Sequence, residues 1–106
     1  MRQSELFTRA RRESPTDETT KNAKLLIRAG FIHKEMAGVY SYLPLGWRVL
    51  QKLEKLIRQE MLALPAQEVL LSALQPKDNW LATGRWGKMS DLYKLRDTSE
   101  REFALG

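Results

Sequence analysis

The sequence predicts an α+β fold in which an N-terminal helix and one long helix accompany an antiparallel sheet and hairpins. Two observations predict it: an apolar stripe at helical spacing over residues 47–64, and short runs of strand-forming residues separated by glycine or polar turns. Hydrophobic residues make up 42% of the 106 residues and charged residues 29%. This balance is typical of globular domains and excludes a chain that is disordered throughout.

The first expected helix runs from Ser14 to about Ala29. Ser14 can cap its N-terminus, Pro15 suits the first helical position, and the acids at 17–18 favour the positive first turn. Gly30 is expected to stop the helix because it adopts a positive φ without steric cost.

A hairpin is predicted over residues 31–43, with Gly38 at its turn. The segment 39–43 is rich in β-branched and aromatic residues, which favour strands. Pro44 is expected to end the second strand because it has no backbone N–H to donate.

The long helix is expected over residues 47–64 and to end at Pro65. One stripe at spacings of three and four carries its apolar residues: Leu50, Leu53, Ile57, Met61 and Leu64. The apolar run 68–71 then predicts a short buried strand. A helix that feeds such a strand is a core packing unit.

The C-terminal part is predicted to alternate turns with short elements. We expect a turn at 75–78, a short helix at 79–82, a loop at 84–87, and strands at 91–96 and 101–105 joined by a polar link at 97–100.

The formal charge of +5 arises from 18 basic and 13 acidic residues. Such a surplus favours contact with polyanions, but many soluble domains carry one without binding nucleic acid. Arg48, Lys52 and Lys55 share one face of the long helix, either as its solvated side, the simpler interpretation, or as an RNA-contacting stripe. The absence of cysteine excludes a disulfide framework and fits a reducing cytosol. No apolar run approaches the ~20 residues that span a bilayer, so no membrane partner is expected.

Catalytic and metal-binding motifs are lacking. The sequence contains no Walker-type loop, no Rossmann glycine pattern, no HExxH and no Cys/His cluster. His33 is the only histidine, and without a nameable partner group we interpret it as structural or solvated. Residues 84–87 match the GxxG letters of a KH loop, but the flanking order differs, so this match is rejected. Trp80 and Trp86 beside Arg85 either stack on a nucleotide base or pack beneath a loop, and the usual burial of tryptophan favours packing.

The order of motifs nevertheless resembles one family closely. The segments that carry the resemblance are RAGFI at 28–32, AGVYSYLPLG at 37–46, QEVLLSALQP at 67–76, WLATGRW at 80–86, and LRD with FALG at 95–97 and 103–106. In this order they are similar to the entry segment of bacterial-type prolyl-tRNA synthetases. The resemblance runs from Ser4 to Gly106, and Arg85 together with the entry hairpin separates it from threonyl-type enzymes.

The resemblance implies that residues 1–106 form the N-terminal part of a class II synthetase catalytic domain, with motif 1 at about 46–76. Motifs 2 and 3, the anticodon-binding domain and the residues that hold proline are expected beyond Gly106. By this resemblance, the full enzyme is expected to use ATP, Mg²⁺, proline and tRNA(Pro) in the cytoplasm and to form a homodimer. For this segment alone we expect no catalytic residue, no metal, no cofactor and no activity. The abrupt end in an apolar strand is interpreted as a truncation.

The resemblance also assigns candidate site residues. The motif 1 dimer interface would comprise Leu50, Leu53, Ile57, Met61, Glu68 and Leu70, and a contact with tRNA or the active-site edge would involve Arg85 and Trp86. The chain departs from the family at Ser72, where motif 1 usually has proline, and at 88–90, where Lys-Met-Ser replaces the usual stretch. Two alternatives remain: a non-catalytic interaction module that pairs through the long helix, and an RNA-binding domain that acts alone.

Overall fold

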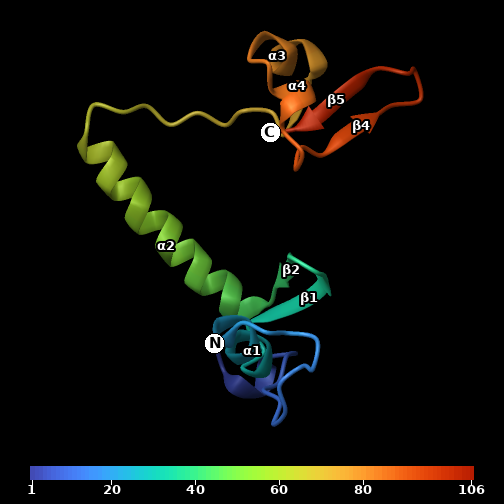
Figure 1. Ribbon diagram of the computed structural model, residues 1–106. Helices are drawn as coiled ribbons and strands as arrows, with labels where there is room; N and C mark the ends of the chain where they lie inside the picture. The colour runs from blue at the N-terminus through green and yellow to red at the C-terminus, as the bar shows by residue number, and fades with distance from the viewer. The chain divides into compact units, whose positions relative to one another are not determined.

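The computed structural model describes residues 1–106, which divide into two compact units, Met1–Gln67 and Glu68–Gly106. Together they give an α+β composition with two antiparallel sheets, as the sequence predicts (Figure 1). None of the helices combines the length and the apolar character needed to cross a bilayer. The two units are described separately below.

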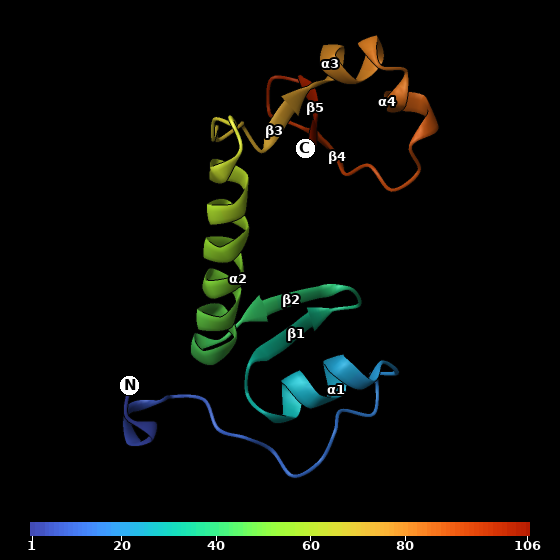
Figure 2. The same ribbon diagram turned by 90° about the vertical axis from the view of Figure 1, so that its left-hand side faces the viewer.

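The first unit contains a short 3-10 helix, two α-helices and one hairpin. Its elements are η1 (Gln3–Glu5), α1 (Lys21–Arg28), β1 (Ile32–Met36), β2 (Val39–Tyr42) and α2 (Pro44–Ala63). Figure 2 shows β1 and β2 side by side, with α1 along one side of the pair. The small core of this unit consists of the buried side chains of Ala23, Ile27 and Ile32.

The first helix begins at Lys21, so the prediction of a start near Ser14 is wrong. The acids at 17–18 do not lie in a helical turn, because Glu18 instead contacts Lys34 and Tyr40 on the hairpin. The predicted stop is confirmed. Gly30 has a φ of +74°, and its N–H donates to the Ile27 carbonyl while the next N–H reaches the Leu26 carbonyl, which closes the helix in a Schellman motif.

The predicted hairpin is confirmed. Ile32 pairs with Tyr42 and Lys34 with Tyr40, and the register shifts between Lys34 and Met36. Gly38 in the turn has a φ of +76°, a conformation that other residues rarely adopt.

The long helix α2 is confirmed but begins earlier than predicted, at Pro44. Proline both ends β2 and occupies the first turn of α2, where its missing N–H costs nothing. Gly46 follows in close contact with the hairpin, since a Cβ added there would lie 2.1 Å from the Phe31 carbonyl oxygen. This close approach fixes the start of α2 against the end of α1 and the start of β1.

The second unit is a three-stranded antiparallel sheet with two short helices. Its elements are β3 (Leu74–Pro76), α3 (Lys77–Ala82), α4 (Arg85–Lys88), β4 (Lys94–Arg96) and β5 (Glu102–Leu105). The strand order is β3-β5-β4. Ala104, in the central strand, is fully buried. The short helix predicted near 79–82 and the two C-terminal strands are therefore confirmed, in shorter form for the strands.

Three predictions in this unit are wrong. Residues 68–71 form no strand, and the apolar side chains there are largely exposed, with Leu70 at 100%. The strand instead forms at Leu74–Pro76, part of which was predicted as a turn, because these residues pair with β5. Pro76 is tolerated because β3 lies at the edge of the sheet. The expected loop at 84–87 lies mostly within α4.

Candidate functional site

Trp86 lies close to two lysine side chains in the second unit. Gly84, with a φ of +70°, turns the chain from α3 into α4 and so positions the indole. The ammonium of Lys77 lies 5.2 Å from the centre of the indole ring, and that of Lys94 lies 4.9 Å from it. Both distances suit a cation–π contact. The indole therefore packs against two lysine side chains, and a contact of Trp86 with tRNA stays a prediction.

Glu102 connects α3 to the sheet. Its carboxylate pairs with Lys77 on α3 and, at 3.1 Å, with Arg96 on β4. The hydrogen bond from Lys77 and then that from Arg96 lower the pKa of Glu102. The carboxylate therefore holds the side chains of Lys77 and Arg96 in place and neutralises part of the positive charge around Trp86.

Arg85 lies beside Trp86 in the sequence but lines a different feature. It borders an open pocket of about 500 Å³ together with Trp80. The amides in this pocket bond to one another, since Asn79 donates to Gln75 at 3.1 Å and Gln75 donates to the Ser72 carbonyl at 2.7 Å. The indole N–H of Trp80 is shielded from solvent and has no hydrogen-bond partner. The structure therefore separates the two residues that the sequence grouped as one contact.

The candidate interface residues of α2 form one row on the helix. Leu50 is half-buried, whereas Leu53, Ile57 and Met61 are 52%, 62% and 52% exposed. Nothing within the first unit covers this row, so it is available to a partner. The other two candidates, Glu68 and Leu70, lie in the second unit on the segment that forms no strand. Their interface role stays a prediction.

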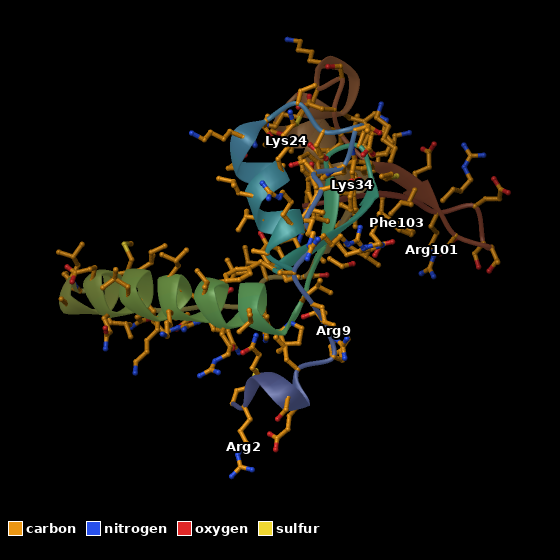
Figure 3. The ribbon with its side chains drawn as sticks, turned by 90° about the horizontal axis from the view of Figure 1, so that it is seen from below. Arg2, Arg9, Lys24, Lys34, Arg101 and Phe103 are labelled. Atoms are coloured by element: carbon orange, nitrogen blue, oxygen red, sulfur yellow. The ribbon has the colours of Figure 1, made fainter.

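A buried ion pair in the first unit was missed by sequence reasoning. Glu18 is only 7% exposed and lies 2.8 Å from the Lys34 ammonium, and it accepts a 2.7 Å hydrogen bond from the Tyr40 hydroxyl (Figure 3 labels Lys34). The hydrogen bond from Lys34 is the main cause that lowers the pKa of Glu18, while the contact with Glu18 raises the pKa of Lys34 and of Tyr40. The two acids at 17–18 were the only sequence signal for this ion pair, and they were equally compatible with the first turn of a helix.

His33 is exposed on β1, and no group of three or more histidine, aspartate, glutamate or cysteine side chains could hold a metal ion. The chain therefore presents an apolar row, a tryptophan–lysine cluster and an arginine-bordered pocket.

These features occur in a chain whose sequence is similar to that of aminoacyl-tRNA ligases over its whole length. The particular relatives are proline–tRNA ligases. That of Geobacillus kaustophilus is 50% identical over 107 residues, that of Kosmotoga olearia 46% over 107, and that of Syntrophus aciditrophicus 49% over 109. Each match covers 100% of this chain and 18–19% of the relative. No protein-family model matches the chain.

The resemblance to prolyl-tRNA synthetases that the motifs predict is therefore confirmed. The chain corresponds to a segment of these ligases and spans less than a fifth of the length of the curated relatives it matches. Sequence identity of 46–50% over the whole length of this chain indicates that the segment has the same fold in these relatives.

Proposed function

We propose that the chain serves as part of a prolyl-tRNA synthetase and that α2 supplies its dimerisation scaffold. The full enzyme would attach proline to tRNA(Pro) with ATP and Mg²⁺. This segment would contribute structure and not catalysis, since no group of three or more histidine, aspartate or glutamate side chains in it could hold the Mg²⁺ that the reaction needs.

The exposed apolar row on α2 is the observation that supports a scaffold role. The helix has 20 residues, about 30 Å by its rise per residue, and carries Leu53, Ile57 and Met61 more than half exposed along one side. In a monomer these side chains would stay in contact with water and would add little to the stability of the fold. Burial against a second copy would contribute about 25 cal/mol for each Å² of apolar surface removed from water.

Self-association of the chain tests this role. Sedimentation equilibrium should show a monomer–dimer equilibrium, and Leu53→Glu with Ile57→Glu should shift it to the monomer by placing two charges in the interface. The control Gln51→Glu with Gln59→Glu changes the same net charge on the same helix outside the row and should leave the equilibrium unchanged. A chain that is monomeric at all concentrations, or a dimer that tolerates the row substitutions, would contradict the proposal.

The isolated chain is proposed to be inactive. Proline-dependent ATP–pyrophosphate exchange should be absent when the 106-residue chain is assayed alone. Turnover by the chain would show that the catalytic groups lie within it.

A further inference from the structure

A basic pocket lies in the first unit, apart from the apolar row of α2. It is an open pocket of about 600 Å³ between residues 1–10, here called the N-terminal arm, and the first turn of α2. Its charged lining residues are Arg2, Arg9 and Arg48, and no aspartate or glutamate lines it. Figure 3 shows Arg2 extending outward from η1, with Arg9 farther along the arm.

None of these three arginines forms an ion pair, whereas Lys34 and Lys77 both bind carboxylates. Their guanidinium groups are therefore available to a ligand. Guanidinium groups form strong, often bidentate hydrogen bonds to phosphate oxygens.

The start of α2 adds a favourable field to the pocket. The N-cap residue Leu43 makes no side-chain capping bond, and Leu45 in the first turn lines the pocket. The free N–H groups of a helix N-terminus carry a partial positive charge that favours an anion. The pocket therefore suits a phosphate group, with the arginines as the main source of attraction.

Positive charge continues from the pocket along α2. Arg48, Lys52 and Lys55 follow at spacings of four and three, are exposed, and share one face over roughly 10 Å. At 100° per residue this face lies roughly opposite the apolar row of Leu53 and Ile57. A single small ion would need only the pocket, whereas a row of this length suits a ligand with several phosphates in series.

We infer that the pocket and this cationic row bind the phosphate backbone of RNA on the side of α2 opposite the dimerisation row. The choice of RNA as the polyanion rests on the proposed function. The preference for phosphate rests on the pocket and the row alone.

Binding of a fluorescein-labelled tRNA transcript, followed by anisotropy over a series of KCl concentrations, tests the inference. The pocket variant is Arg9→Gln with Arg48→Gln, and the row variant is Lys52→Gln with Lys55→Gln. The matched control is Lys24→Gln with Lys88→Gln, which removes the same charge outside both features. Circular dichroism establishes that each variant keeps its helix content.

Each of the pocket and row variants should make the slope of log affinity against log salt shallower by about 2, because two phosphate contacts are lost. The control should keep the wild-type slope. Equal slopes for all three variants, or no RNA binding by the wild-type chain, would overturn the inference. Titration with inorganic phosphate and with AMP distinguishes a free phosphate ligand from RNA. Tight binding of either small ligand, with RNA affinity unaffected by the variants, would assign the pocket to a free phosphate and overturn the inference that it binds RNA.

The outcome is separable from that of the proposed function. The RNA-facing substitutions lie away from the apolar row, so they should leave the monomer–dimer equilibrium unchanged. A chain that dimerises without binding RNA would contradict only the present inference.

Discussion

The Lys34 ammonium lies 2.8 Å from the Glu18 carboxylate, with only 19% and 6% of the two side chains exposed. Lys34 also approaches Asp17 at 3.1 Å. This ion pair holds the segment before α1 against the β1–β2 hairpin, two elements that are separated in the sequence by the whole of α1. It explains why residues 14–20 do not extend the helix.

Loss of this carboxylate charge should destabilise the first unit in a pH-dependent manner. The pKa of Glu18 is lowered from about 4.5, so its contribution is present above that pH and is lost as the pH falls through the folded-state pKa. The pKa of Lys34 is raised from about 10.5, so its contribution is present below that pH and is lost as the pH rises through its folded-state pKa.

Glu18→Gln should therefore lower the thermal unfolding midpoint at pH 7, and the difference from wild type should narrow as the pH falls below 4.5. Thermal melts followed by circular dichroism across this range provide the check. Glu13→Gln, at an exposed position, is the control and should change little. If Glu18→Gln lowered the unfolding midpoint by the same amount at every acidic pH, the ion pair would not be the cause of the change.

Addition of one methyl group at Gly46 should disrupt the junction between the hairpin and α2. The new Cβ would lie 2.1 Å from the Phe31 carbonyl oxygen, so the backbone must shift. Gly46→Ala should cost about 1–3 kcal/mol or more in free energy of unfolding, the usual range for overpacking.

Gly87→Ala is the matched control, because a Cβ at this helical position meets nothing within 4 Å. It should be neutral or slightly stabilising, since alanine favours a helix over glycine by about 0.5–1 kcal/mol. Urea unfolding of both variants compares the two free energies. A Gly46→Ala variant as stable as wild type would contradict the close contact.

The contact between Lys94 and Trp86 should be measurable as a coupling energy. A double-mutant cycle of Lys94→Met and Trp86→Leu should give a coupling of about 0.5–1 kcal/mol, the range for exposed cation–π pairs. Lys88→Met in place of Lys94→Met is the control cycle, because no contact of Lys88 with the ring is found. Equal coupling in both cycles would show that Lys94 does not interact specifically with the indole.

Elements with strong local signals could be predicted from the sequence. The stripe that includes Leu53 and Ile57 is enough to identify α2, and Gly38 between two runs of strand formers is enough to identify the hairpin. Gly30 marks the end of α1 because its positive φ is a local requirement. In each case the determining interactions lie within a few residues of one another.

Elements that depend on distant partners could not be predicted in the same way. Residues 68–71 have a strand-like composition, but the backbone pairs with β5 only from Leu74 onward. The start of α1 depends on Lys34, which follows that helix in the sequence. The separation of Arg85 from Trp86 depends on where Lys77, Lys94 and the pocket residues come to lie, which residue types alone do not fix.

Proline-dependent ATP–pyrophosphate exchange by a chimeric enzyme tests the central proposal most directly. Residues 1–106 would replace the corresponding segment of the Geobacillus kaustophilus proline–tRNA ligase, to which they are 50% identical. We expect an active dimeric enzyme, and expect Leu53→Glu with Ile57→Glu in the chimera to abolish both dimer and exchange. A folded dimeric chimera without exchange activity would contradict the assignment of this chain to a prolyl-tRNA synthetase scaffold.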